Sequence, residues 1–292
     1  MKIFFVTLFV VIAVGYYNLS HRTAGQYFVT KDGVRLYYTD DGPKDADPVI
    51  LLHGFAVNAD LNWRRTGFID RLLREGYHVI AMDLRGHGLS DHPTEEAKYG
   101  KPVADDVIEL ADQLGLEKFH LIGYSIGGVV AIRVAVDHPD RVLKLIPLAS
   151  GWDDPDSSEL FVGLKKASDD IKRTGSIEPI IGYLDESVKR SAWQSFVVRL
   201  ITYFTVDRNA LAPFIGQAAQ LAVSKSQLGS LSIPICAIIG EKDPFLKSAE
   251  LLAEIKPGSG PIVIPDANHM NAIRSEKLQD AAIHFLKTGS CG

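Results

Sequence analysis

This sequence of 292 residues has few cysteines and no excess of basic residues. The two cysteines, Cys236 and Cys291, permit at most one disulfide, and the CxxC and CxxH spacings of a structural zinc site are absent. Lys plus Arg number 31 against 36 Asp plus Glu, which gives a net charge of −5. Because a nucleic-acid binder normally carries a basic surface, this balance argues against nucleic acid as a partner.

The overall composition excludes disorder and a disulfide-stapled miniprotein. Apolar residues make up 46% of the chain and charged residues 23%, as in ordinary soluble globular proteins. A chain of this length buries a full hydrophobic core and corresponds to one or two domains. The average composition conceals one local anomaly, at the N-terminus.

The N-terminal apolar run is shorter than the roughly 20 residues that a spanning helix needs. It extends from Ile3 to Val14, the length of a signal-peptide apolar region, and Ala13 and Gly15 provide small residues before a cleavage site at Tyr16. With Asn18 and Leu19 the run reaches a marginal span. Residues 1–19 are therefore expected to be a signal peptide or, alternatively, an N-terminal membrane anchor, with attachment through residues 3–19. Either places the body of the protein outside the cytoplasm, in the periplasm, the secretory pathway or the medium, or at a membrane.

From residue 26 onward, strands are expected to alternate with helices. Asp32-Gly33 between two apolar runs predicts a β-hairpin. The runs that follow lack polar alternation, which is typical of parallel strands covered by helices on both faces. The predicted strands are Tyr27–Thr30, Val34–Tyr38, Pro48–Leu52, His78–Met82, Phe119–Ile122, Val142–Leu148, Ile233–Ile239 and Pro261–Ile264. Helical periodicity lies between them, so the pattern predicts an α/β fold with a mostly parallel, doubly wound sheet.

One long helical stretch interrupts this alternation after the sixth strand. The apolar stripe Trp193, Phe196, Val197 and Leu200 lies in it, and Tyr203, Phe204 and Phe214 add aromatic side chains. An insertion on the carboxyl side of a strand lies over the ligand crevice of such a sheet. Residues 152–228 are therefore expected to form a helical cap over a core of residues 26–151 and 229–288. Its ten acidic and nine basic residues between Asp153 and Lys225 give no reason to expect a highly charged substrate.

The strongest chemical signal is Gly123-Tyr-Ser-Ile-Gly127, followed by Gly128. It follows the predicted strand Phe119–Ile122 and precedes a helical pattern at Val129–Val136. This is the strand–turn–helix setting of a G-x-S-x-G nucleophile elbow, whose serine is held on a strained turn. Ser125 is the predicted nucleophile.

A serine hydroxyl needs a base, and the base needs an orienting carboxylate. His269 follows the last predicted strand and is the expected base, because His284 lies within a helical pattern. Asp243 directly follows the strand Ile233–Ile239 and is the expected acid. The alternatives for the acid are Asp153 and Asp154. Glu241 and Asp266 are expected to be solvated loop residues.

Backbone N–H groups of Phe55 and Ile126 are the expected oxyanion hole, because one follows the strand Pro48–Leu52 and the other follows the nucleophile. Tyr124 and Trp152 are expected to line the substrate pocket. His53 reads as a structural hydrogen-bonding group. No metal ion or organic cofactor is expected: the cluster of Asp83, His87, Asp91 and His92 could suggest a metal, but its glycine-rich context favours a structural loop.

These segments together resemble the cap-bearing, esterase- and lipase-like branch of the α/β-hydrolase superfamily. The residues that carry the resemblance are His53-Gly-Phe55, Asp83-Leu-Arg-Gly-His-Gly-Leu-Ser90, the Ser125 elbow, Gly240-Glu-Lys-Asp243 and Asn268-His269. Epoxide hydrolases and haloalkane dehalogenases of this branch carry an aspartate at the elbow. Proline iminopeptidases show a Gly-Gly-Ser-Trp-Gly elbow and acidic groups in the cap. Since neither pattern is present, the resemblance implies a serine esterase.

The expected function is therefore cleavage of carboxylic esters of small, largely uncharged or apolar substrates through an acyl-serine intermediate. Carbon–carbon bond hydrolysis and perhydrolysis use the same three side chains and remain alternatives. A ligand receptor on the hydrolase fold is the alternative from another class. The sequence leaves the physiological ester and the oligomeric state open.

Overall fold

The computed structural model describes residues 24–157, 159–184 and 207–291, and an eight-stranded sheet crosses it in the order β1-β2-β4-β3-β5-β6-β7-β8. β1 and β2 pair antiparallel with each other, β2 pairs antiparallel with β4, and the remaining neighbours are parallel. The strands are β1 (Gln26–Val29), β2 (Arg35–Asp41), β3 (Pro48–Leu52), β4 (His78–Met82), β5 (Phe119–Tyr124), β6 (Val142–Leu148), β7 (Ile238–Gly240) and β8 (Ile262–Ile264). The predicted α/β fold and the hairpin at Asp32-Gly33 are confirmed.

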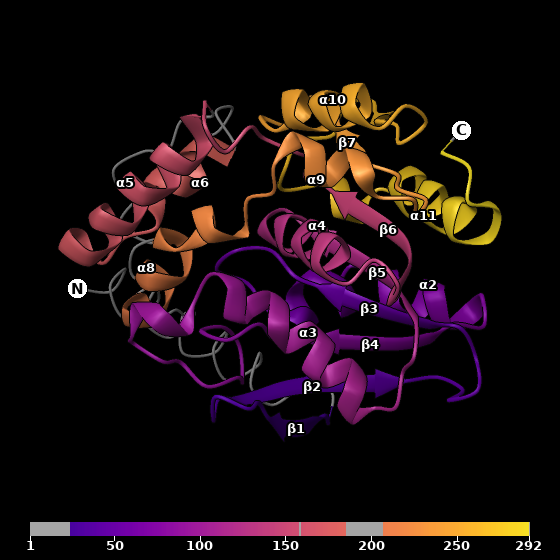
Figure 1. Cartoon of the computed structure of the whole chain (residues 1–292), viewed down its shortest axis with the longest axis horizontal. Helices are drawn as coiled ribbons and strands as arrows, with labels where there is room; N and C mark the ends of the chain where they lie inside the picture. Colours follow the sequence, from indigo (N-terminus) through magenta and orange to yellow (C-terminus); the bar gives the residue numbers. More distant parts are fainter. Residues whose placement is uncertain (1–23, 158, 185–206, 292) are drawn as a thin grey trace, which may run out of the picture.

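Helices cover both faces of the sheet, which explains why its central strands are apolar throughout. In β3, Ile50 and Leu52 join one buried cluster with α3 and α4, whereas Val49 and Leu51 join a second cluster with α2 and α11. Figure 1 shows α3 and α4 crossing in front of the strands. These four helices span α2 (Phe68–Arg74), α3 (Lys101–Gln113), α4 (Ile126–Asp137) and α11 (Glu276–Thr288), and α10 (Leu246–Ile255) packs on β7.

Several predicted elements have different bounds, among them α4 and β7. Helix α4 begins at Ile126, directly after Ser125, rather than at Val129. The strand predicted from Ile233 is reduced to Ile238–Gly240, preceded by an isolated bridge between Leu145 and Ile235. Proline at position 234 has no N–H to donate to a ladder, so the pairing that begins this segment cannot be continuous.

A group of helices connects β6 to β7. Its described members are α5 (Glu159–Thr174), α6 (Glu178–Leu184), α8 (Arg208–Gly216), the 3₁₀ turn η3 (Ala218–Leu221) and α9 (Lys225–Ser230). Helices α5 and α8 pack against each other, and Ser168 of α5 donates its hydroxyl to the backbone oxygen of Ala212 in α8 at 2.7 Å. Figure 1 shows α5, α6 and α8 together at one side of the sheet. The stripe that contains Trp193, and Tyr203 and Phe204, lie outside the described residues.

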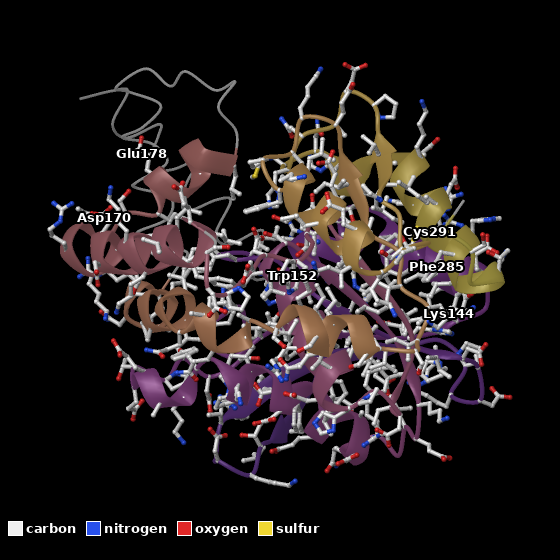
Figure 2. All side chains as sticks on the ribbon, turned by 45° about the horizontal axis from the view of Figure 1, so that its top comes forward. Lys144, Trp152, Asp170, Glu178, Phe285 and Cys291 are labelled. Carbon is white, nitrogen blue, oxygen red and sulfur yellow. A yellow bond between two sulfur atoms is a disulfide. The ribbon has the colours of Figure 1, made fainter. Side chains whose placement is uncertain are left out.

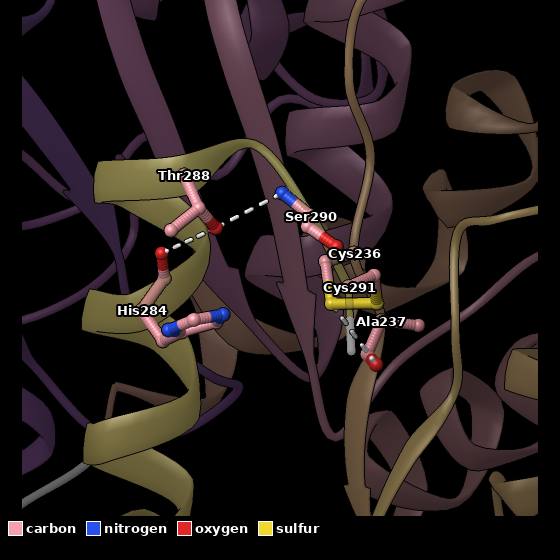
Figure 3. Close-up of a disulfide and its surroundings, with 6 residues drawn as sticks. All are labelled: Cys236, Ala237, His284, Thr288, Ser290 and Cys291. Carbon is pink, nitrogen blue, oxygen red and sulfur yellow. Dashed lines mark hydrogen bonds between the residues drawn. A yellow bond between two sulfur atoms is a disulfide. The ribbon is translucent and has the colours of Figure 1, made fainter.

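Cys236 and Cys291 form a disulfide across 55 residues of sequence (Figure 3). Cys236 is fully buried just before β7, and Cys291 lies in the segment after α11. The bridge therefore joins the C-terminal tail to the sheet. It closes a segment that contains both Asp243 and His269.

The described residues contain no helix that is long and apolar enough to cross a membrane. The predicted signal peptide or anchor at residues 1–19 lies outside the described ranges.

Candidate active site

Ser125 lies on a sharp turn between β5 and α4. Its backbone has φ of 56° and ψ of −122°, a left-handed conformation that a residue with a side chain adopts only under strain. The turn is tight because glycines permit close approach: a Cβ atom on Gly123 would lie 2.1 Å from the backbone oxygen of Gly127. One on Gly127 would lie 2.3 Å from the oxygen of Leu52. This is the elbow that the G-x-S-x-G pattern predicts.

The structure brings Ser125, His269 and Asp243 into one hydrogen-bonded chain. His269 Nε2 lies 2.9 Å from Ser125 Oγ, and His269 Nδ1 lies 2.9 Å from Asp243 Oδ2. Because a carboxylate can only accept, Nδ1–H donates to Asp243 and leaves Nε2 free to accept the serine proton. Asp243 and His269 are almost fully buried, so the carboxylate and the imidazole face each other away from bulk water.

Loops at the carboxyl ends of β7 and β8 hold the acid and the base. The second oxygen of Asp243 accepts the backbone N–H of Phe245 at 2.9 Å. The side-chain oxygen of Asn268 accepts the N–H groups of Met270 and Asn271, each at 3.0 Å. Local turns therefore order the two loops that carry Asp243 and His269.

The alternative residues lie elsewhere. Asp154 caps the turn before α5, where it accepts the N–H of Asp156 and the hydroxyl of Ser157. Asp153 lies on the wall of the cavity, but the carboxylate beside His269 is that of Asp243. Glu241 and Asp266 are exposed loop residues, and His284 is exposed on α11.

Phe55 and Ile126 are the residues whose backbone N–H groups are the predicted oxyanion-hole donors. Both residues line the same cavity as Ser125. Among the described residues, no hydrogen-bond acceptor is matched to either N–H group. Two unpaired donors beside a nucleophile could therefore bind an oxygen that becomes negatively charged during the reaction.

His53 is a structural residue. Its Nδ1–H donates to the backbone oxygen of Gly54 at 2.7 Å, and its Nε2 accepts the N–H of Leu84 at 3.0 Å. Complete burial lowers the pKa of His53, which keeps the ring neutral, and the two hydrogen bonds fix its tautomer.

The loop Asp83–Asp91 is held by its own hydrogen bonds. Asp83 accepts the N–H groups of Ala59 and Leu89, each at 2.8 Å. Buried Arg85 pairs with Asp106 and Asp32. Within the described ranges, no group of three or more His, Cys, Asp or Glu is arranged to hold a metal ion. The hydrogen bonds of Asp83 and the ion pairs of Arg85 agree with the interpretation of the segment as a structural loop.

A largely apolar cavity of about 530 Å³, partly open to solvent, lies between the elbow and the inserted helices. Leu160 and Leu164 of α5 line one side of it, and Ile215 of α8 contributes from the same group of helices. Among the described residues, the polar side chains on its wall are Ser125, Ser150, Asp153 and Ser248. Phe245, which no sequence motif marks, also lines the cavity and lies with its ring centre 5.1 Å from that of His269.

The sequence predicts Tyr124 and Trp152 in the wall of the substrate pocket. Neither residue is among those that form the cavity in the described part of the chain. The phenol of Tyr124 points to the backbone oxygen of His269, at 2.6 Å. The indole N–H of Trp152 donates to the backbone oxygen of Val223 at 2.8 Å, and the ring lies between the core and the inserted helices (Figure 2). Both side chains are buried and donate hydrogen bonds to backbone oxygens, and neither is among the described residues that line the cavity.

Comparison with known proteins agrees with this geometry. A family model described as the alpha/beta hydrolase fold matches residues 47–166. Over 260 residues the chain is 28% identical to a Bacillus subtilis protein assigned as a 2-succinyl-6-hydroxy-2,4-cyclohexadiene-1-carboxylate synthase, covering 85% of this chain and 92% of that protein. Over 118 residues it is 41% identical to a non-heme chloroperoxidase of Streptomyces lividans, covering 40% and 41% of the two chains.

A solved structure is similar over almost the whole chain. A thermophilic esterase from Thermogutta terrifontis superposes with a TM-score of 0.75 at 28% identity, covering 92% of this chain and 100% of the esterase. The family match, this superposition and the serine elbow on a mostly parallel sheet show that the chain belongs to the α/β-hydrolase superfamily.

Proposed function

We propose that this protein is a serine esterase that cleaves carboxylic esters of small, largely uncharged or apolar substrates. The observation that carries the proposal is the chain of two 2.9 Å contacts from Ser125 through His269 to Asp243. The mostly apolar wall of the adjoining cavity supports the substrate class. Similarity to the Thermogutta terrifontis esterase supports the same reaction.

Acylation begins when Nε2 of His269 takes the proton of Ser125 as the serine oxygen attacks the ester carbonyl. The N–H groups of Phe55 and Ile126 stabilise the negative charge on the carbonyl oxygen, and Asp243 stabilises the imidazolium. The imidazolium then gives its proton to the departing alcohol. The carbon–oxygen bond of the ester breaks and leaves an acyl group on Ser125.

Deacylation repeats these steps with water as the nucleophile. His269 takes a proton from the water as it attacks the acyl carbonyl, and the collapse of the second tetrahedral intermediate returns that proton to Ser125. The carboxylic acid leaves and the free enzyme is restored. Residues 152–228 act as the cap in this proposal, because Leu160, Leu164 and Ile215 would contact the substrate.

Turnover of short p-nitrophenyl esters by residues 20–292 tests the function. The wild-type protein should complete many cycles, and Ser125→Ala should lose at least about 10⁴-fold in kcat. Undiminished turnover by Ser125→Ala would contradict the proposal. A single turnover with a lasting adduct in the wild type would instead favour a ligand receptor, and activity confined to peroxide or to carbon–carbon substrates would favour the related reactions.

We also propose that the protein acts outside the cytoplasm. The apolar segment at residues 3–14 supports this location, and so does the disulfide between Cys236 and Cys291, because disulfides persist in oxidising compartments. Fractionation of expressing cells should place the protein in the periplasm, the medium or the membrane fraction. Recovery of the full-length chain in the cytosol with both cysteines reduced would contradict the proposal.

A further inference from the structure

Two neighbouring residues of the β5–α4 turn contact the same histidine. Tyr124 donates its phenol hydroxyl to the backbone oxygen of His269 at 2.6 Å, and Ser125 contacts Nε2 of the same residue at 2.9 Å. Adjacent residues therefore contact the main chain and the ring of His269: Tyr124 bonds to its backbone oxygen and Ser125 contacts its imidazole. These contacts join segments that are about 145 residues apart.

The Tyr124 side chain is closely confined. It is only 5% exposed, and Trp63 packs edge-on against its ring with centroids 6.3 Å apart. The rings of Tyr124 and His269 lie 5.6 Å apart. Burial, and then the negative charge of Asp243, raise the pKa of the Tyr124 phenol, so the hydroxyl stays protonated and can donate.

We propose that Tyr124 is a positioning residue, which sets the distance between the ring of His269 and Ser125 by fixing the main chain of the histidine loop. The inference rests on the proposed esterase function. His269 lies in the loop between β8 and η4 (Ala272–Arg274), where no strand ladder fixes its carbonyl group. The phenol supplies that fixed point from the rigid end of β5.

The expected consequence is kinetic. Proton transfer depends on the contact between Ser125 and His269, and a displacement of about 1 Å in an active site can cost about 10²-fold in rate. Tyr124 does not line the cavity, so substrate binding should be largely unaffected. Loss of the hydroxyl should therefore lower kcat and kcat/KM together and leave KM nearly constant.

Tyr124→Phe tests the role, with Tyr99→Phe as its matched control. The phenol of Tyr99 also donates to a backbone oxygen, that of Pro93 at 2.5 Å, and the residue is buried with its ring against Phe214. Both variants lose one buried hydroxyl and should show a similar decrease in the midpoint of thermal unfolding. Only Tyr124→Phe should lose about tenfold or more in kcat and in the rate of Ser125 labelling by a fluorophosphonate.

Replacement of Tyr124 by 4-aminophenylalanine restores an N–H donor at the same position and should recover most of the lost kcat. Replacement by 4-fluorophenylalanine fills the space without a donor, should not restore kcat, and provides a second test if Tyr124→Phe does not fold. A folded donor-free variant with kcat within twofold of wild type would overturn the positioning role, while the wild-type enzyme remained an esterase. Failure of the proposed function is distinct, because the wild type would then lack ester turnover altogether.

Discussion

The sheet core and the helices inserted between β6 and β7 contribute to the same cavity in different ways. The core supplies Ser125, His269 and Asp243 from three turns at the carboxyl edge of the sheet, each fixed by hydrogen bonds at 2.6–3.0 Å. The inserted helices supply apolar side chains, among them Leu160, Leu164 and Ile215. Directional bonds fix the chemistry, whereas non-directional packing shapes the space for substrate.

This difference predicts that core substitutions change the rate or the stability of the enzyme, whereas substitutions in the inserted helices change which ester it prefers. Members of one superfamily can share the first region and differ in the second, because function resides in the site rather than in the fold.

After removal of the nucleophile itself, the largest effect is expected from Asp243→Asn. An amide in place of the carboxylate would favour the wrong tautomer of His269 and would not stabilise the imidazolium, so kcat should decrease by about 10⁴-fold. Esterase turnover at neutral pH measures the loss. Asp154→Asn is the matched control, because Asp154 caps the turn before α5 and should leave kcat within twofold. A large loss in the control with little loss in Asp243→Asn would move the acid to the end of β6.

Removal of the disulfide should rank next. In the chain-entropy account, a bridge that closes 55 residues stabilises the folded state by about 4 kcal/mol. The double variant Cys236→Ala, Cys291→Ala should unfold at a lower denaturant concentration, as should the reduced wild type. Dithiothreitol should not destabilise the double variant further. At low temperature the variant should keep kcat, because neither cysteine contacts Asp243 or His269; a loss of activity without loss of stability would contradict this separation.

His120 in β5 should make the core sensitive to acid. Burial, and then the positive charge of Lys144, lower the pKa of His120 to about 4. In the unfolded chain His120 binds a proton as the pH falls below about 6.5, whereas in the folded chain it does not. The free energy of unfolding is therefore highest above pH 6.5 and decreases by about 3 kcal/mol as the pH falls towards 4.

The variant His120→Leu should show a smaller decrease in the free energy of unfolding between pH 7 and pH 4, measured by urea titration. Nδ1 of His120 in the wild-type protein has no hydrogen-bond partner in the described part of the chain. Leucine at this position therefore deprives no known partner of that nitrogen. His284→Leu makes the same change at an exposed position on α11 and should retain the wild-type dependence. Buried His53 and His87, whose pKa values are also lowered, should maintain some acid sensitivity in both variants. Equal curves for His120→Leu and the wild type would exclude the assigned role.

The smallest effect is expected in the inserted helices. Leu164→Ala enlarges the cavity and should shift the preferred acyl chain to a longer one, changing kcat/KM for individual esters by about 10-fold. Labelling of Ser125 by a small fluorophosphonate should be unchanged. Val162→Ala is the control on the same helix, since Val162 is 71% exposed and faces away from the cavity. An equal shift in both variants would indicate a general effect on α5 rather than a change of cavity shape.

The central strands and the catalytic turns that follow them are the parts of the molecule most completely predictable from sequence. The strands Pro48–Leu52 and His78–Met82 have the predicted bounds, because uninterrupted apolar runs between turn residues leave little choice of register. The positions of Ser125, Asp243 and His269 directly after strands predict that they meet, because the fold brings the carboxyl ends of parallel strands to one edge.

Side-chain direction is the part that sequence position does not determine. Tyr124 adjoins the nucleophile and Trp152 follows β6, yet their rings point to His269 and Val223 rather than into the cavity. Alternation along a strand becomes unreliable where the chain leaves the sheet, since the left-handed turn at Ser125 redirects its neighbours. Disulfide pairing was also open, because 55 residues separate the two cysteines in sequence and only the folded sheet brings them together.

The most direct measurement of the central claim is the mass of the enzyme quenched during turnover of a slowly deacylated ester. The account predicts an increase by one acyl group, mapped by peptide fragmentation to Ser125 and absent from Ser125→Ala. A short burst of released alcohol should accompany it, equal to one equivalent of active sites. An acyl group on another residue, or full turnover by Ser125→Ala without any adduct, would contradict the account.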